Sequence, residues 1–318
     1  MEARKVGESS AIETRDLTRR FGKLTAVDHL DLQVPVGSLF GLIGPNGAGK
    51  TTTLRMLAGL LDATSGEIVL NGQTMNHGRD WGELQRQIGY MPDFFGVYED
   101  MLVWEYLDFF GRCYGLPAAR RRQVTDELLE LVDLGEKRDT YVQTLSRGMR
   151  QRLCLAHALV HDPSVLLLDE PASGLDPRAR VEMRELLREL GAMGKTIVVS
   201  SHILAELAEL CDSVGIIERG RLVISGALDE VRRRATAGRM LHIQALSDRD
   251  TAMAVLRDQR GVGQVYAVNG GALEAEFVGD EEAIADLLQS LLARGVRVVA
   301  FNEITGDLEE VFLRLTEG

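Results

Sequence analysis

The sequence is poor in aromatic residues, proline and cysteine, and it has no long apolar run. Of the 318 residues, 5% are aromatic, 7 are proline and 3 are cysteine. No uninterrupted apolar stretch approaches the roughly 18 residues of a membrane-spanning helix. The polar start, Met1 to Ser10, does not resemble a secretion signal. We therefore expect a soluble, cytoplasmic chain that reaches a membrane only through a partner.

Positive charge is also scarce, most of all near the C-terminus. The net charge is −12, and residues 240–318 hold 14 acidic against 6 basic side chains. An acidic segment of this kind repels phosphate backbones and anionic lipid surfaces. We therefore predict that the chain does not bind nucleic acid.

The three cysteines lie far apart and form no C-x-x-C pair. Cys154, His157 and His161 do fall at helical spacing, which would place three metal ligands on one face of a helix. The residues around them are apolar, however, and this favours packed side chains over a metal site. We predict neither a disulfide nor a structural metal.

What the chain does have is a phosphate-binding pattern at residues 44–51. The letters GPNGAGKT match G-x-x-x-x-G-K-[ST], between an apolar strand, Leu39–Ile43, and a helix, Thr52–Ala58. Glycines let the loop backbone and the helix N-terminus face an anion. Lys50 would reach the β- and γ-phosphates, and the Thr51 hydroxyl would coordinate Mg²⁺. We predict that the chain binds a nucleoside triphosphate through Gly44, Pro45, Asn46, Gly47, Ala48, Gly49, Lys50, Thr51 and Thr52.

Two adjacent carboxylates follow a second apolar strand, Val165–Leu168. Ligands bind at the carboxyl edge of open α/β sheets, so Asp169 suits Mg²⁺ and Glu170 suits the polarisation of an attacking water. His202 follows another buried strand, Thr196–Ser200, and can donate to a γ-phosphate oxygen. An acidic pair alone would mark a helix start, and a lone histidine is usually structural. The phosphate loop favours the functional interpretation of both.

Three further features have a structural and a functional interpretation. Phe21 can pack in the core, or stack on a purine bound at the loop. The segment Phe94–Tyr114 holds eight aromatic residues, which suit either a core or a groove for a partner helix. Ser146 can cap a helix, Met149–Val160, whose N-terminus is a second potential phosphate site.

Beyond a hairpin and a helix, Leu228–Arg234, residues 235–239 are predicted to form a linker. Residues 240–318 then follow the order strand, helix, two strands, helix, strand, helix, which predicts a small ferredoxin-like α+β domain. The predicted elements are Leu241–Ala245, Thr251–Asp258, Val265–Val268, Leu273–Phe277, Glu281–Leu292, Val296–Phe301 and Leu308–Leu315.

Taken together, these patterns resemble the nucleotide-binding subunit of ATP-binding cassette (ABC) transporters, from about Ile12 to Arg234. Residues 44–51 resemble its Walker A loop, 165–170 Walker B, 145–149 the signature motif and 173–176 the D-loop, and His202 resembles the switch histidine. The resemblance implies an α/β P-loop ATPase domain at 1–234, with a helical signature subdomain at about 93–160.

The resemblance also implies roles. Glu170 would be the general base, Asp169 a Mg²⁺ ligand, His202 a γ-phosphate contact and Phe21 the adenine-stacking residue. In this family two copies sandwich two ATP molecules head to tail, so Ser146 and Gly148 would serve the nucleotide of a second subunit, here most simply a second copy of this chain. The segment Phe94–Tyr114 corresponds to the docking surface for a membrane permease on the inner face of the membrane.

The chain departs from the family pattern in two places. The signature usually reads Leu-Ser-Gly-Gly-Gln, whereas Arg147 and Met149 stand here. Asp93 replaces a glutamine; it coordinates metal well but adds negative charge beside a triphosphate. We expect Asp93 to remain a Mg²⁺ ligand with slower turnover or an altered metal preference. Identical rates with Mg²⁺ and Mn²⁺ in the wild type and in Asp93→Gln would contradict this.

The tail, with Asp307–Phe312, resembles a domain appended to the ATPases of bacterial type-two exporters. The leading hypothesis is an ATPase subunit that dimerises on ATP and powers a separate permease in export. The alternative is a nucleotide-gated assembly module in which Asp93 suppresses turnover. A soluble ABC ATPase of translation or DNA repair is disfavoured by the single cassette, the acidic balance and the lack of a coiled-coil insertion. Glu170 and His202 together favour hydrolysis.

Overall fold

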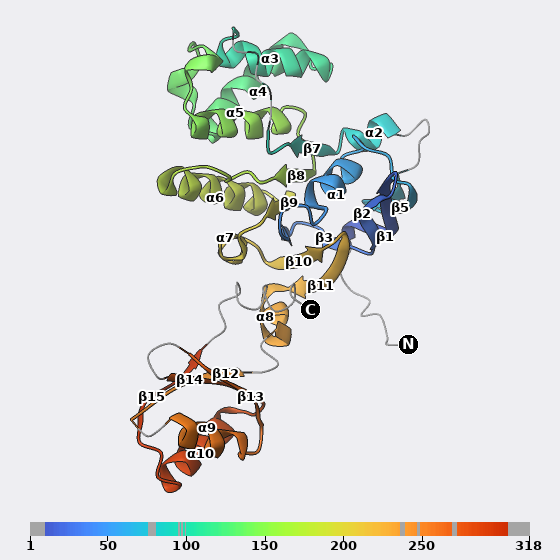
Figure 1. Cartoon of the computed structure of the whole chain (residues 1–318). Coiled ribbons are helices and arrows are strands. Elements are labelled where there is room, and N and C mark those ends of the chain that lie inside the picture. The colour runs from blue at the N-terminus through green and yellow to red at the C-terminus, as the bar shows by residue number, and fades with distance from the viewer. Residues whose placement is uncertain are drawn as a thin grey trace. The chain divides into compact units, whose positions relative to one another are not determined.

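The computed structural model describes residues 10–75, 81–94, 96, 98, 100–235, 239–246, 249–268 and 272–304. The chain divides into two compact units, Met1–Leu228 and Asp229–Gly318, and Figure 1 shows their elements. None of the helices within these described ranges is long and apolar enough to cross a membrane.

The first unit is built around a six-stranded sheet with the strand order β11-β10-β4-β9-β8-β7. Its strands from β10 to β7 run parallel, and β11 is antiparallel at the edge. The apolar strands β4, β8 and β9 are buried throughout, as expected of central parallel strands. The bounds are β4 Leu39–Ile43, β7 Ile88–Met91, β8 Val165–Asp169, β9 Thr196–Ser201, β10 Ser213–Glu218 and β11 Arg221–Ala227.

A second sheet of antiparallel strands pairs β1 with β2, β3 and β5. The alternation of Leu30, Leu32 and Val34 in the sequence predicts one strand from Ala26 to Val34, but this prediction is wrong, because β2 and β3 are separate strands. The Thr14 hydroxyl on β1 donates to the Leu30 carbonyl at 2.7 Å and accepts from the Leu32 N–H at 2.9 Å, so it bonds to the chain on both sides of the break. The sequence predicts a loop at residues 19–23, but the loop is shorter, since β1 extends through Phe21. The bounds are β1 Ser10–Phe21, β2 Leu24–Leu30, β3 Gln33–Pro35, β5 Ser65–Leu70 and β6 Gln73–Thr74.

The helices α3 (Val103–Cys113), α4 (Ala118–Leu131) and α5 (Arg147–Leu159) pack on one another. Asp108 on α3 accepts from the Nε atom of Arg121 on α4 at 2.7 Å. The spacing of Trp104, Leu107 and Phe110 predicts one buried stripe on this helix, which is only partly correct, because Trp104 and Phe110 are half-buried. The buried face of α3 is made by Val103, Tyr106, Leu107, Asp108 and Gly111.

The side chains considered above as metal ligands all have packing roles on or beside α5. Cys154 is buried, which raises its pKa. The ring of His157 stacks on Phe110 with centroids 3.6 Å apart, and burial lowers the His157 pKa to about 4. His161 stacks on Tyr114 and places Nε2 3.0 Å from the Ile88 carbonyl.

Two helices of the first unit, α6 and α5, start at a residue whose side chain caps them. Asp176 caps α6 by accepting from the Ala179 N–H at 2.9 Å, and Pro177 takes the first helical position. Ser146 caps α5 by accepting from the Met149 N–H at 3.3 Å. The bounds are α1 Lys50–Leu57, α2 Trp81–Gln85, α6 Pro177–Ala192, α7 Leu204–Ala208 and α8 Leu228–Ala235, which runs into the second unit.

The second unit holds a four-stranded antiparallel sheet with the order β13-β14-β12-β15. Two helices follow β12 and β14, which gives the predicted ferredoxin-like order of elements. Three sequence predictions fall wholly or mostly outside the described residues. They are the helix Leu308–Leu315, the segment Asp307–Phe312 that resembles the exporter ATPases, and most of the linker. The bounds are β12 Arg239–Ala245, α9 Arg249–Arg257, β13 Val262–Ala267, β14 Ala272–Phe277, α10 Glu281–Ala293 and β15 Val298–Ile304.

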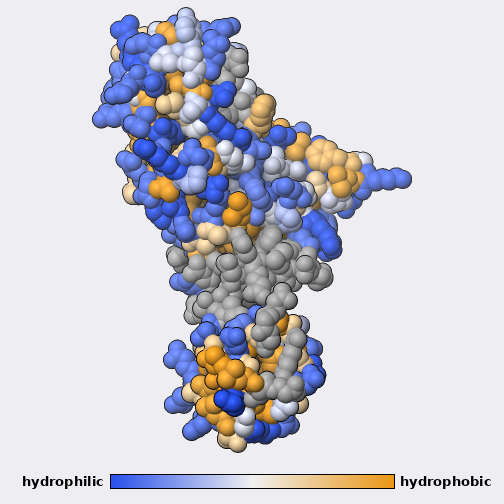
Figure 2. Space-filling model, turned by 60° about the vertical axis from the view of Figure 1, so that its left-hand side comes forward, coloured by the Kyte–Doolittle hydropathy of each residue, from blue (hydrophilic) through white to orange (hydrophobic). Residues whose placement is uncertain are grey.

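Each unit has a core of its own. In the second unit Leu241, Leu256 and Phe277 are among the side chains that are fully buried. Apolar residues also appear on the surface of this unit in Figure 2, and Leu246, Val278 and Val299 are exposed there. Catalytic motifs were predicted only in the first unit, so the site is built from its sheet edge.

Candidate functional site

The carboxyl ends of β4, β8 and β9 meet at one edge of the central sheet, and a pocket of about 490 Å³ lies there. Most of the residues predicted from the sequence to contact the nucleotide line this pocket. Gly44 and Asp169 belong to the same edge without lining it. The lining is made by Phe21, Leu24, Ala26, residues 45–52, Asp93, Glu170, Ser173 and His202.

Lys50 is folded back into the loop that precedes it. The Nζ atom donates to the carbonyl oxygens of Gly44 at 2.7 Å and Pro45 at 3.3 Å. It also lies 3.4 Å from Oε1 of Glu170. The side chain is 6% exposed, so its charge faces the loop and a carboxylate, where a phosphate could replace these partners.

Two loop glycines are required by close contacts with neighbouring strands. A Cβ on Gly44 would lie 2.4 Å from the Ile217 carbonyl oxygen. A Cβ on Gly49 would lie 2.5 Å from the Ala26 carbonyl oxygen, and Gly49 has φ +107°, which favours glycine. The loop therefore keeps its curvature only without side chains at these positions.

Asp169 ends β8 and is 1% exposed. Its Oδ1 atom accepts from the Ser200 hydroxyl at 2.7 Å. The buried Oδ2 atom has no hydrogen-bond partner among the described residues. Buried polar atoms are normally satisfied, and a carboxylate oxygen left open is the kind of ligand that Mg²⁺ takes. With the Thr51 hydroxyl and the Asp93 carboxylate at the pocket, the donor set fits this ion.

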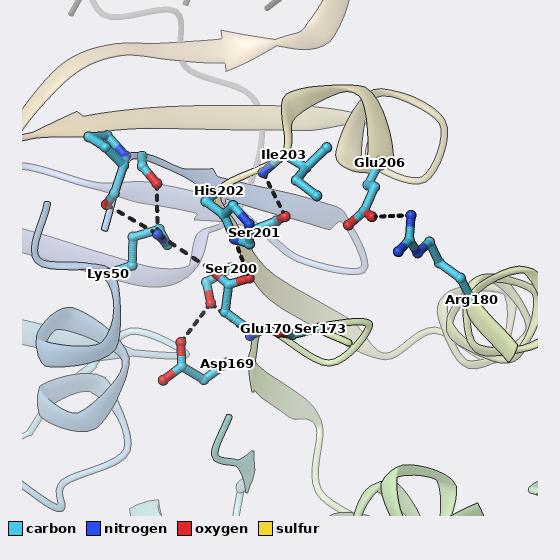
Figure 3. Close-up of polar contacts among 12 residues, drawn as sticks. Lys50, Asp169, Glu170, Ser173, Arg180, Ser200, Ser201, His202, Ile203 and Glu206 are labelled. Carbon is cyan, nitrogen blue, oxygen red and sulfur yellow. Dashed lines mark hydrogen bonds and ion pairs between the residues drawn. The ribbon is translucent and has the colours of Figure 1, made fainter. Parts of the chain in front are cut away.

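Glu170 lies between a cation and an imidazole (Figure 3). His202 Nδ1 is 2.9 Å from Oε2, opposite the Lys50 contact. The Glu170 N–H donates to the Ser200 hydroxyl at 3.0 Å. Its φ of +51° is left-handed, a conformation that a non-glycine residue adopts at a cost of about 1 to 3 kcal/mol where its surroundings hold it. The carboxylate is therefore held by contacts at both of its oxygen atoms.

His202 is held between β9 and α7. The Ser201 hydroxyl accepts from the Ile203 N–H at 3.0 Å, which fixes the chain directly after His202. Arg180 Nη1 on α6 pairs with Oε1 of Glu206 on α7 at 2.9 Å, and Figure 3 shows this pair beside the site. The short connection that carries His202 is therefore held in place by these contacts.

Two of the signature residues, Ser146 and Gly148, do not line this pocket. Ser146 is exposed at the N-terminus of α5. Gly148 packs on α6, where an added Cβ would lie 3.2 Å from the Ala179 Cβ. Within one chain these residues do not contact the nucleotide site.

Some residues at the site were not predicted from the sequence. Ser200 bonds to both acidic residues, and Ser173, Leu24 and Ala26 line the pocket. Ser200 stands two positions before His202 at the end of a buried strand, which was the only available signal. Ser173 belongs to the segment that resembles the D-loop, and Leu24 and Ala26 carry no chemical signature.

Comparison with known proteins places two family matches along the chain. Residues 27–173 match the family described as "ABC transporter", and residues 226–316 match "ATP-binding protein DrrA1-3-like, C-terminal domain". The Nod factor export ATP-binding protein I of Ralstonia nicotianae is 36% identical over 98% of this chain and 95% of that protein. The bacitracin transport ATP-binding protein BcrA of Bacillus licheniformis is 35% identical over 98% of each.

A solved structure of an ATP-binding subunit of an ABC transporter has the same fold as the first unit. It is 32% identical, has a TM-score of 0.63, and the match covers 71% of this chain and 93% of that one. The match therefore extends over nearly all of that subunit.

Proposed function

This chain belongs to the ABC transporter family as an ATP-binding subunit, and from this premise we propose that it hydrolyses ATP as a dimer to drive export through a separate membrane permease. Relatives that match this chain over nearly its full length are named for export or transport. The relatives named for export support transport out of the cell. In this proposal residues 1–234 form the ATPase domain and 240–318 an accessory domain. The chain would be peripheral on the inner face of the cell membrane, held by the permease.

The observation that carries the proposal is the convergence of Lys50, Glu170 and His202 on one pocket. Lys50 would exchange its loop carbonyls for the β- and γ-phosphates of ATP. The Glu170 carboxylate would then be free to accept the proton of the attacking water. His202 would donate to an oxygen of the γ-phosphate and hold Glu170 in line.

Thr51, Asp93 and Asp169 are proposed to hold Mg²⁺. When bound, the ion supplies positive charge that neutralises the phosphate oxygens during transfer. Phe21 is 45% exposed at the pocket, and the Arg19 guanidinium lies 4.6 Å from its ring centroid. An aromatic ring with one covered and one open face suits stacking on adenine.

The position of Ser146 and Gly148 supports the proposed dimer. Ser146 is exposed and lies outside the pocket of its own chain. A serine hydroxyl at a helix N-terminus can bind a phosphate, and the nucleotide of a second chain is the one it would reach. A homodimer then has two complete sites, each with loop residues from one chain and Ser146 and Gly148 from the other.

Exposed aromatic residues on and before α3 support docking to the permease. Phe94 is 90% exposed, Tyr98 56% and Phe109 38%, whereas Trp104 is half-buried with the Arg138 guanidinium over its ring. Phe94→Ala should reduce copurification with the permease while ATP affinity and thermal stability stay unchanged. Val36, 55% exposed in another part of the unit, provides the control Val36→Ala. Equal copurification of both variants would rule out this surface.

The catalytic assignment is tested by separating ATP binding from hydrolysis. Lys50→Met removes the charge that contacts the phosphates, so it should lose ATP binding. Glu170→Gln keeps the shape of the side chain but cannot take up the proton, so it should bind ATP and lose turnover by roughly a hundredfold or more. Binding is measured with a fluorescent ATP analogue and hydrolysis by phosphate release. Wild-type hydrolysis in Glu170→Gln would show that Glu170 is not the base.

A further inference from the structure

Two side chains of α5 bind the backbone of the turn that follows Glu170. Arg147, the first residue of α5, donates from Nη2 to the carbonyl oxygen of Ser173 at 2.9 Å. Gln151, one turn further along, donates from Nε2 to the same oxygen at 3.3 Å. A carbonyl oxygen has two lone pairs and can accept both bonds.

The contact of Arg147 is close as well as polar. Its guanidinium lies over Gly174, and a Cβ there would be 2.4 Å from the Arg147 Cζ. Gly174 has φ +65°, a conformation that favours glycine, and a side chain there would displace the Arg147 guanidinium. Gln151 beneath is only 4% exposed, whereas Arg147 reaches the turn from the surface.

The turn transmits this contact to Glu170. The Ser173 N–H donates to the Glu170 carbonyl oxygen at 3.0 Å, and Ser173 lines the same pocket as Glu170. Glu170 keeps its left-handed backbone only while its neighbours hold it. A shift of Ser173 would therefore move the Glu170 carboxylate relative to Lys50 and His202.

We propose that Arg147 is a positioning residue for hydrolysis, which holds the Ser173 carbonyl and thereby sets the position of Glu170 in its own chain. The inference rests on the proposed function, since it takes Glu170 as the base and the dimer as the working unit. Arg147 directly follows Ser146, so α5 would connect the two sites of the dimer. When the nucleotide of the first chain binds Ser146 of the second chain, Arg147 of the second chain would transmit this contact to Glu170 of the second chain.

The test places one substitution in either chain of a mixed dimer. A dilute chain with intact Glu170 is mixed with a large excess of Glu170→Gln chain, and ATP hydrolysis per intact chain is measured. Arg147→Ala is introduced either into the chain with intact Glu170 or into the Glu170→Gln chain. Because the excess of Glu170→Gln chain would hide a folding defect in that arm, thermal unfolding and ATP binding of each Arg147→Ala chain are measured separately and should match those of the chains without it.

With Arg147→Ala in the chain that carries intact Glu170, kcat should fall by about tenfold, the scale expected for a slightly misplaced catalytic group. The KM for ATP should stay unchanged. With Arg147→Ala in the Glu170→Gln chain, the rate should stay at that of the unsubstituted mixture. Arg147→Lys, which keeps the charge but not the planar fork, should restore part of kcat. Arg120, which pairs with Glu127 on α4, provides the control Arg120→Ala.

Three results would overturn the inference. Equal losses in both arms would mean general damage, and a loss confined to the Glu170→Gln chain would mean that Arg147 acts on the other chain's nucleotide. No loss in either arm would mean that the contact has no role in turnover. Failure of the proposed function is recognised separately: if excess Glu170→Gln chain does not raise the rate of dilute intact chain, the dimer is wrong and the inference falls with it.

Discussion

The Ser200 hydroxyl forms hydrogen bonds with both acidic residues of the site. It accepts from the Glu170 N–H and donates to Oδ1 of Asp169. Ser200 is fully buried, and Asp169 is 1% exposed. One hydroxyl therefore satisfies two polar groups that solvent reaches poorly.

Ser200→Ala should lower the free energy of unfolding by about 1 to 3 kcal/mol, because it leaves two groups without their partner. It should also lower kcat, since Glu170 loses a contact that holds its backbone. Urea unfolding and phosphate release measure the two effects. Ser38→Ala is the matched control: the Ser38 hydroxyl bonds to the Pro35 carbonyl in a half-buried turn remote from the site. Equal stability of Ser200→Ala and wild type would contradict this role of Ser200.

At the residue scale, sequence reasoning reaches positions whose chemistry follows from a local pattern. The loop at 44–51, Glu170 and His202 are of this kind, and the structure brings them to one sheet edge. Ser200 and Gln151 could not be found in this way. Their bonds join segments 22 to 31 residues apart, and serine and glutamine suit many other environments equally well.

At the scale of elements, α3 and α5 pack through aromatic rings and a neutral histidine. His157 stacks on Phe110 and meets Tyr106 edge-on at 5.8 Å. Burial, and to a smaller extent His161, lowers its pKa from 6.5 to about 4. The folded protein therefore keeps this ring uncharged at neutral pH.

The packing of His157 makes stability depend on pH in a defined direction. Between pH 6.5 and about 4 the unfolded chain protonates this histidine and the folded chain does not. Stability is therefore lost as the pH falls through this window, by on the order of 3 kcal/mol. His157→Phe keeps an aromatic ring without the titration, so its unfolding free energy should fall less steeply. Parallel pH profiles for the two proteins, measured by urea unfolding, would contradict the assignment.

Element boundaries were predictable where one pattern dominates. The apolar runs of β4, β8 and β9 and the caps at Ser146 and Asp176 are local signals. The break between β2 and β3 was not predictable, because the alternation of Leu30, Leu32 and Val34 continues across it. At the break, the chain bonds to the Thr14 hydroxyl, which comes from another strand.

At the scale of the whole molecule, the proposed dimer means that one chain holds two incomplete halves of a site. The pocket carries Lys50, Glu170 and His202, whereas Ser146 and Gly148 lie outside it. The order of strands and helices in the second unit concerns the whole unit, but it could be predicted, because each element has its own periodicity in the sequence. The arrangement of two chains around ATP has no such local signal, since it depends on a surface that one chain presents to another.

The most direct test measures steady-state ATP hydrolysis per molecule across a range of protein concentrations, with Glu170→Gln as the blank. A site shared between two chains predicts that activity per molecule rises with concentration, approaches a plateau, and is absent from the blank. Activity per molecule that is constant down to high dilution, and well above the blank, would contradict the shared site, because one chain would then suffice for hydrolysis.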